Sequence, residues 1–195
     1  MSDFSLLIES SLKKFSTVIP DINILQFIIV IPSLQKLLLI DKKSVKFTYD
    51  ISTSKYGLGN INNSYKTPIG LHYIAEKIGH NMPIFTIFKG REPLENNLTL
   101  EQFMKDENLE IRHHHFDKHD DVITTRILWL KGYEAGINLG GNVDTYNRYI
   151  YIHGTAHEDH IGKKSSHGCI RMKNQDILEL FKHSQINMPV IIMDS

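Results

Sequence analysis

The segment QKLLLIDKKSVKFTYDIS (residues 35–52) carries the pattern of a β-hairpin. Lys36–Ile40 is an apolar run and Asp41–Ser44 is a polar turn. From Val45 to Ile51 apolar residues alternate strictly with polar ones, as in a strand with one exposed face. β-Propensity and bounding turn residues predict further strands at Leu71–Ala75, Ile84–Phe88, Ile123–Leu130, Tyr149–Ile152 and Val190–Met193.

Three short helices are predicted around these strands. Apolar residues at helical spacing between Phe4 and Phe15 predict the first, which Pro20 separates from the rest of the chain. Thr99 and Gln102 form a capping-box pattern before the second. Asn174 is the expected N-cap of the third. Because strands and helices do not alternate regularly, we expect a mainly β, β-rich α+β fold with an antiparallel or mixed sheet.

Length and composition limit the possible domain organisation and the possible binding partners. The 195 residues suit one compact domain, and we predict an N-terminal helical and apolar appendage at residues 1–34 and the main domain at residues 35–195. A net charge of zero offers no global attraction for nucleic acid. The apolar stretch Ile24–Ile31 is too short to span a membrane and is expected to be a core strand. Composition leaves the oligomeric state open.

The chemically informative region is RYIYIHGTAHEDHIGKKSSHGCIRM, residues 148–172. A strand is expected to deliver His153 at its end, where Gly154 permits a sharp turn. A second turn holds Cys169, the only cysteine of the chain, beside Gly168. Successive backbone N–H groups in such a turn can converge on one point. A thiol beside convergent donors is an arrangement suited to acyl transfer.

A reactive thiol needs a neighbouring imidazole or positive charge to favour the thiolate. His153 and His167 are the candidates. We favour His153 as the base because it comes from a different element and can approach the sulfur across the site. Taken singly, a cysteine is more often a small buried hydrophobe and a histidine more often a structural residue. The combined constellation favours chemistry.

This constellation resembles the catalytic domain of the YkuD-type L,D-transpeptidase family. The resemblance rests on His153-Gly154-Thr155 and on SHGCIRM at residues 166–172, with further similarity in TPIG at residues 67–70 and in GGNVDTYNRYIYIHGT at residues 140–155. It covers Gln35 to the C-terminus. It implies a β-sandwich-like fold in which the histidine and the cysteine face each other in a groove.

The resemblance also implies residue roles. Cys169 would attack the carbonyl that joins an L-centred diamino acid to the terminal D-alanine of a peptidoglycan tetrapeptide stem. His153 would move protons, oriented by the carbonyl of Gly154. Backbone N–H groups of His167, Gly168 and Cys169 would line an oxyanion hole. The remaining substrate-binding candidates are Ser166 and Arg171; Arg171 would either clamp a substrate carboxylate or only hold the loop by a salt bridge.

Attack on the resulting acyl-enzyme by an amine of a second stem would give a cross-link, and attack by water would give carboxypeptidase activity. Two other hypotheses stay open: a Cys-His amidase acting on a different amide, and a non-catalytic wall-binding module. The paired His153 and Cys169 speak against the last, because a binding module needs neither.

No cofactor and no metal are expected. The segment His113–Asp121 contains four histidines and three aspartates, but ligands crowded in one polar loop without helical spacing favour a solvated loop over a metal site. The resemblance implies action in the cell envelope or periplasm on peptidoglycan stems. The N-terminal residues do not resemble a secretory signal, so a cytoplasmic location also stays open.

Overall fold

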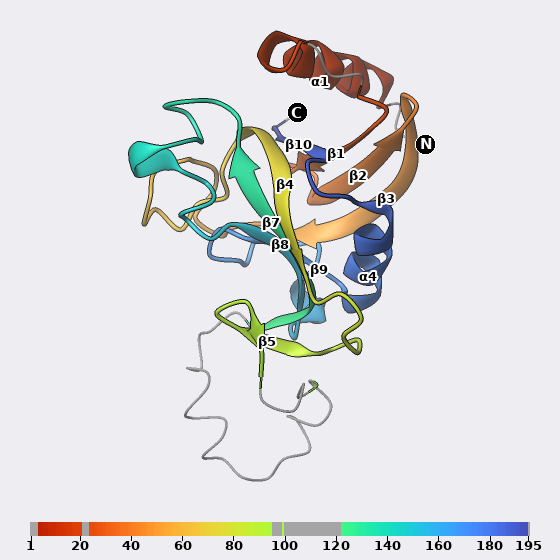
Figure 1. The fold of residues 1–195 in the computed structure, drawn as a ribbon, viewed down its shortest axis with the longest axis vertical. Helices are drawn as coiled ribbons and strands as arrows, with labels where there is room; N and C mark the ends of the chain where they lie inside the picture. The colour runs from red at the N-terminus through yellow and green to blue at the C-terminus, as the bar shows by residue number, and fades with distance from the viewer. Residues whose placement is uncertain (1–3, 21–23, 95–98, 100–121, 195) are drawn as a thin grey trace.

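A computed structural model describes residues 4–20, 24–94, 99 and 122–194. Over these residues the fold is mainly β, as the sequence predicts, with ten strands in one mixed sheet and two α-helices (Figure 1). The elements are α1 Ser5–Val18, β1 Gln26–Ile31, β2 Lys36–Asp41, β3 Ser44–Ser52, β4 Gly70–Ile78, β5 Ile87–Lys89, β6 Glu92–Pro93, β7 Ile123–Gly132, β8 Tyr151–Thr155, β9 Ile170–Met172, α4 Asn174–His183 and β10 Pro189–Ile192, with short 3-10 helices at Gly141–Val143 and Glu158–His160.

The sheet closes on itself. Its strand order is β4-β10-β1-β2-β3-β9-β8-β7-β5-β6, and β4 also pairs with β7, so that eight strands form a ring. The β1–β10 and β8–β9 pairs are parallel and the others are antiparallel. The predicted hairpin at residues 36–52 is confirmed as β2 and β3.

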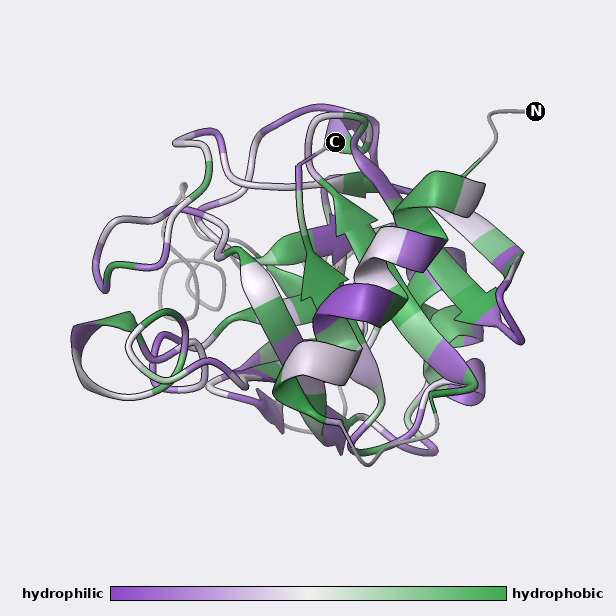
Figure 2. Ribbon diagram, turned by 90° about the horizontal axis from the view of Figure 1, so that it is seen from above, coloured by the Kyte–Doolittle hydropathy of each residue, from purple (hydrophilic) through white to green (hydrophobic). Residues whose placement is uncertain are grey.

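Two apolar clusters explain why β1 and β2 are continuous apolar runs. One face of these strands supplies residues such as Val30 and Leu39 to a large core that also takes in Ile177 and Phe181 of α4. The other face, including Phe27, packs under α1. Figure 2 shows α1 lying across these apolar strands. A strand buried on both faces has no exposed position at which a polar residue is favoured.

The N-terminal helix is amphipathic, and its buried Ile8, Ser11 and Phe15 face the sheet. The Phe15 and Phe27 rings meet edge to face with centroids 5.4 Å apart. The expected core strand at Ile24–Ile31 is present as β1, which pairs with β2. The domain boundary predicted after residue 34 falls in the turn between these two strands and stays a prediction. Within the described part of the chain, no helix combines the length and apolar composition needed to cross a bilayer.

Two predicted strands are displaced by turns with left-handed backbone. Tyr149 has φ of 56° and its N–H donates to the Tyr146 carbonyl, so β8 begins at Tyr151 and continues through Gly154 to Thr155. Phe85 has φ of 68°, so β5 begins only at Ile87. The helix predicted beyond Thr99 and the segment His113–Asp121 lie outside the described residues.

Candidate active site

His153 lies fully buried in β8, as a strand-borne base requires. Its Nδ1 lies 2.8 Å from the carbonyl oxygen of Gly154. Because a carbonyl only accepts, Nδ1 carries the proton in this contact, and the neutral imidazole therefore presents Nε2 as its basic nitrogen. This is the orienting contact that the family resemblance implies.

Cys169 directly precedes β9, which runs parallel to β8. In that register Ile152 pairs with Ile170 and His153 pairs with Arg171. Side chains of paired residues share a face and alternate along the strand. Ile152 and Ile170 enter the large core. His153 therefore projects from the opposite face, on which Cys169 packs beside Tyr151.

The buried hydroxyl of Ser166 stabilises the turn that precedes Cys169. Ser166 is fully buried, and its Oγ donates to the Cys169 carbonyl at 2.6 Å and accepts from the Gly168 N–H at 3.3 Å. Gly168 has φ of 128°, and a Cβ there would lie 3.3 Å from Ile150 Cδ1. Ser166, predicted to contact substrate, is thus placed inside the turn, and Gly168 is the residue type that this backbone permits.

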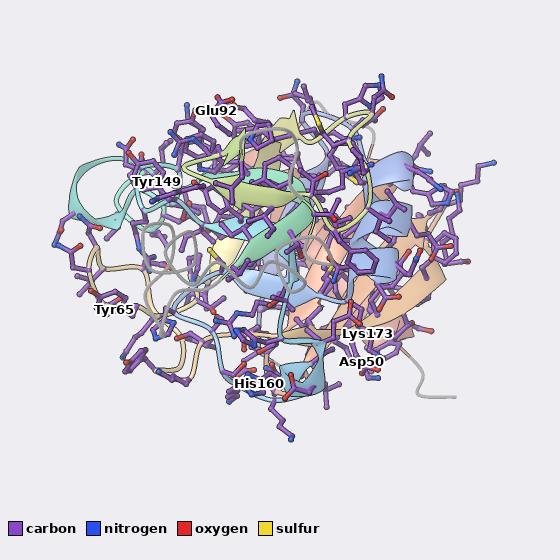
Figure 3. All side chains as sticks on the ribbon, turned by 90° about the horizontal axis from the view of Figure 1, so that it is seen from below. Asp50, Tyr65, Glu92, Tyr149, His160 and Lys173 are labelled. Carbon is purple, nitrogen blue, oxygen red and sulfur yellow. The ribbon has the colours of Figure 1, made fainter. Side chains whose placement is uncertain are left out.

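His167 is separated from this buried interior. Its ring is half-buried and lies near Tyr56 and Tyr65, with centroids 5.9 and 6.2 Å away. Figure 3 shows Tyr65 and Tyr149 on the same side of the molecule, away from Asp50 and Lys173. The two candidate imidazoles therefore differ in setting, since His153 is fixed in a strand and His167 in an aromatic surface cluster.

Polar and charged groups surround the sulfur. The thiol of Cys169 donates to the Tyr149 carbonyl at 3.4 Å. Burial lowers the pKa of Arg148, while the charge of Cys169 raises it, so the two groups are close enough to interact. The Arg148 guanidinium is anchored by the carbonyls of Gly59 (3.2 Å) and Lys66 (2.6 Å). A fixed cation in this place favours the thiolate form of the sulfur.

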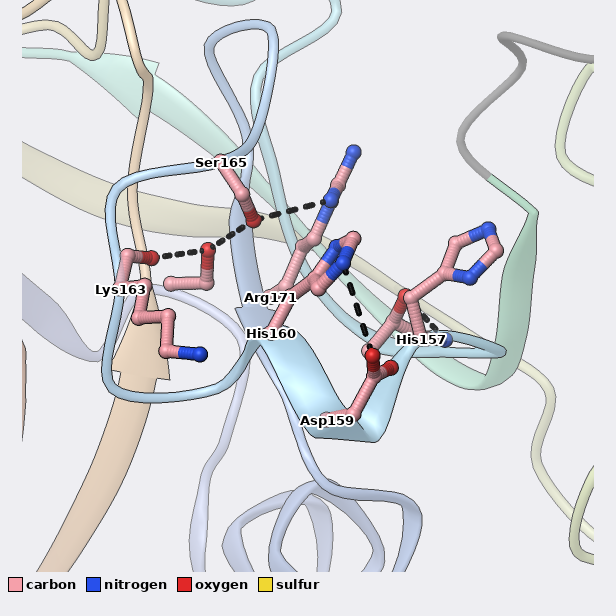
Figure 4. A network of polar contacts seen from close by, with 8 residues as sticks. His157, Asp159, His160, Lys163, Ser165 and Arg171 are labelled. Atoms are coloured by element: carbon pink, nitrogen blue, oxygen red, sulfur yellow. Dashed lines mark hydrogen bonds and ion pairs between the residues drawn. The ribbon is translucent and has the colours of Figure 1, made fainter.

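Arg171 is nearly buried beside the same strand pair. Its Nη1 donates to Ser165 Oγ at 3.3 Å, and Ser165 shares a 2.8 Å hydrogen bond with Ser52, whose hydroxyl also donates to the Lys163 carbonyl (Figure 4). The side chain is 4% exposed. Of the two roles left open by the sequence, this network favours holding the loop that precedes Cys169.

Sequence reasoning missed the part that Asn174 takes. Asn174 is the first residue of α4, and Lys173 takes the N-cap position predicted for Asn174. Its Oδ1 accepts from the hydroxyls of Thr124 and Thr125, and its Nδ2 donates to the Thr155 carbonyl and to Glu158. These contacts brace the end of β8 against a bulge in β7.

The contacts of Asn174 with β7 and β8 leave no room for a side chain at Gly154, the residue after His153. The β7–β8 register shifts between Thr124 and Ile127, and Thr125 has φ of 66°, a strained conformation for a β-branched residue. A Cβ on Gly154 would lie 2.6 Å from the Thr124 carbonyl and 2.7 Å from Asn174 Oδ1. Gly154 is therefore required by close packing, where the sequence suggested only a sharp turn.

The family assignment comes from comparison of the whole chain. The protein-family model described as YkuD, L,D-transpeptidase catalytic domain, matches residues 25–192 of this chain. These residues include the entire sheet and the site. The chain belongs to this family. The site that contains Cys169 and His153 is therefore the candidate active site of a YkuD domain.

Individual relatives are distant or cover little of the chain. The Bacillus subtilis (strain 168) protein named "Putative L,D-transpeptidase YqjB" is 42% identical over 50 residues, 26% of this chain and 28% of that protein. Mycobacterium tuberculosis L,D-transpeptidase 3, solved with a faropenem-derived adduct, superposes with a TM-score of 0.50 at 12% identity, over 87% of this chain and 60% of that one.

A third relative, the Ldtfm-avibactam carbamoyl enzyme, superposes with a TM-score of 0.51 at 16% identity, over 88% of this chain and 49% of that one. At these identities the structural likeness establishes the YkuD fold. The chain corresponds to between 28% and 60% of the length of these three relatives.

Proposed function

We propose that this YkuD domain catalyses cysteine-dependent acyl transfer on peptidoglycan tetrapeptide stems. The thiolate of Cys169 adds to the carbonyl of the L-centred diamino acid, and the bond to the terminal D-alanine breaks. The proton that Nε2 of His153 takes from the Cys169 thiol passes to the departing amine, and a thioester remains. An amine of a second stem then attacks the thioester, transfers its proton to His153 and gives a cross-link; water in its place gives the free acid.

One observation carries the proposal. The parallel β8–β9 register brings Cys169 and His153 onto the same face of adjacent strands, while the Gly154 carbonyl fixes the His153 tautomer with Nε2 as the base. A nucleophile and an oriented base on rigid elements are the parts that acyl transfer needs. The family membership adds the substrate class, because YkuD enzymes act on peptidoglycan.

The test is incubation with purified disaccharide tetrapeptide, read by mass spectrometry. Loss of D-alanine with dimer formation supports transpeptidation, and loss without dimer supports carboxypeptidation. The Cys169→Ala variant should fold and show neither. Unchanged substrate with the wild-type protein, or turnover by Cys169→Ala, overturns the proposal. Turnover of a different amide would favour a Cys-His amidase instead.

A second assay reports on the sulfur directly. A carbapenem presents a strained acyl group, and we expect its mass to be added to the wild-type chain and not to Cys169→Ala.

The cellular compartment is also a proposal: the activity belongs in the cell envelope, where the peptidoglycan stems are. Fractionation of cells that express the tagged chain tests it, and recovery in the cytoplasm alone would argue against an envelope role.

A further inference from the structure

An aromatic cluster lies against the thiol and is not used by the proposed chemistry. It consists of Trp129 on β7, Tyr151 on β8, and Tyr146 and Tyr149 in the turn before β8, and we call it the aromatic shelf. Trp129 stacks on Tyr146 with centroids 3.9 Å apart, and lies 5.7 Å from Tyr149 and 5.5 Å from Tyr151.

The shelf adjoins Cys169 through two of its members. Tyr149 accepts the thiol hydrogen bond through its carbonyl, and Tyr151 packs in the same cluster as Cys169. The Tyr149 side chain is 53% exposed, whereas Trp129 is 5% exposed. The shelf therefore has a buried base and an open side next to the sulfur.

A guanidinium lies over this shelf. Arg91 follows β5 at the turn of the β5–β6 hairpin, and its Cζ is 4.7 Å from the Trp129 ring centroid and 5.1 Å from that of Tyr149. Its Nη1 also donates to the Tyr151 hydroxyl at 3.4 Å. Arg91 and Cys169 thus share Tyr149 and Tyr151 as neighbours although they are far apart in the sequence.

The other three arginines that the structure describes are engaged by the protein itself. Arg126 donates to the carbonyls of Thr125 and Met82. Arg148 holds two loop carbonyls, and Arg171 is nearly buried against Ser165. Arg91 makes one such contact, to the Tyr151 hydroxyl, and otherwise rests on aromatic faces at a partly open surface, which orients its planar fork. The hydrogen bond to Tyr151 raises the pKa of Arg91, and the carboxylate of Glu76, which accepts from the Tyr146 hydroxyl, is near enough to raise it further, so this side of the shelf already favours the pairing of the guanidinium with an anion.

We propose that Arg91 and the aromatic shelf form a binding subsite for a carboxylate of the peptide substrate, beside Cys169. This inference rests on the proposed function, because a tetrapeptide stem carries a terminal carboxylate and can carry another on its diamino acid. A guanidinium binds a carboxylate through two parallel hydrogen bonds. The shelf excludes water from one side of that pair, and its rings pack against the peptide.

The experiment compares the acid with its amides. Kinetics are measured for wild type, Arg91→Gln, Arg91→Lys and the control Lys14→Gln, which removes an exposed charge on α1. Each protein receives the tetrapeptide, the same peptide with a C-terminal amide, and the peptide with the diamino acid carboxylate amidated. Binding of the same peptides to Cys169→Ala and to Cys169→Ala with Arg91→Gln is measured by calorimetry.

Arg91→Gln should raise KM for the acid about 10- to 100-fold, the range of a charge-assisted hydrogen bond, with a smaller change in kcat. One of the two amidated peptides lacks the carboxylate that Arg91 binds. For that peptide, wild type and Arg91→Gln should have equally high KM values, and this equality identifies which carboxylate is bound. Arg91→Lys should recover only part of the loss, and Lys14→Gln should match wild type.

The experiment distinguishes a failure of the proposed function from a failure of the proposed subsite. If wild type does not convert the tetrapeptide and Cys169→Ala does not bind it, the proposed function is overturned and the subsite with it. If wild type converts the tetrapeptide but Arg91→Gln keeps its KM and its preference for acid over amide, only the subsite is overturned. Melting curves of the four proteins exclude misfolding as the cause of a raised KM.

Discussion

His153 and His167 are the two histidines of the HGT and SHGC motifs and the two candidates for the base, and substitution should distinguish their roles. His153→Ala should lose about a hundredfold or more in rate, the range for a general base, and should slow alkylation of Cys169 at neutral pH. His167 lies in the surface cluster with Tyr56 and Tyr65 and not on the strand that holds His153, so the alkylation rate of His167→Ala should fall less. Iodoacetamide kinetics on both variants measure this. The reverse order would assign the base to His167.

Asn174 is expected to position His153 through the end of β8. Asn174→Ala removes the contacts with Thr155 and with the β7 bulge, so the Gly154 carbonyl that orients His153 loses its support. A small displacement of a catalytic group costs about a hundredfold. We expect kcat to fall by about 10- to 100-fold and the pH profile of Cys169 alkylation to shift.

The matched control for Asn174 is Gln175→Ala, which alters the next residue of the same helix at an exposed position. It should leave the rate and the pH profile unchanged. If Asn174→Ala lowers only the melting temperature and keeps the wild-type alkylation profile below that temperature, Asn174 stabilises the fold without positioning the base.

Site residues differ in how far the sequence reveals them. His153 and Cys169 are predictable because each stands beside a glycine in a short motif that also sets its local backbone. Asn174 and Arg91 are not, because their neighbours come from β7 and β8, which only the closed sheet brings together. An asparagine at the start of a helix is interpreted as a cap until its side-chain partners are known.

The strands also differ in how far the sequence predicts them. The alternation in β3 predicts that strand because one of its faces is exposed near Lys46 and Thr48. The end of β8 runs through Gly154, a residue of low strand propensity that close packing demands. The parallel β1–β10 and β8–β9 pairs and the ring closure through β4–β7 produce no local periodicity in the sequence.

Strand β4 contains a buried histidine that should make stability depend on pH. His72 is fully buried between the Gly70 carbonyl (3.0 Å from Nδ1) and the Thr145 hydroxyl (3.1 Å from Nε2), and burial lowers its pKa from 6.5 to about 3. Below pH 6.5 the unfolded chain therefore binds a proton that the folded chain does not. His72 supports folding fully above pH 6.5, and this contribution is lost as the pH falls toward 3.

Urea unfolding at several pH values measures this effect. The slope contributed by one such proton is at most about 1.4 kcal/mol per pH unit. His72→Gln should be less stable than wild type at pH 7 but should lose less stability between about pH 6.5 and 4. His80→Gln, at an exposed position, serves as the control. Parallel curves for wild type and His72→Gln would show that His72 does not titrate in this way.

The closed sheet carries α1 and the candidate active site on different strands of its outer face, the face opposite to the large core. Helix α1 covers this face at β1, β2 and β10, while the candidate active site lies at β8 and β9, which β3 separates from β2 in the strand order. The strands under α1 cannot remain exposed, because Phe27, Ile29, Leu38 and Ile40 would form a continuous apolar surface. The helix is therefore expected to act on stability and solubility rather than on the chemistry.

Phe15→Ala tests that separation. Phe15 is fully buried against Phe27, and truncation of such a side chain costs about 3 to 5 kcal/mol, or roughly 6 to 20 °C in Tm for a chain of this size. Below the new Tm, carbapenem labelling of Cys169 should proceed at the wild-type rate. Lys14→Ala, exposed at the neighbouring position, should change neither quantity. A Phe15→Ala protein that stays folded but labels slowly would mean that α1 is coupled to the strands that hold His153 and Cys169.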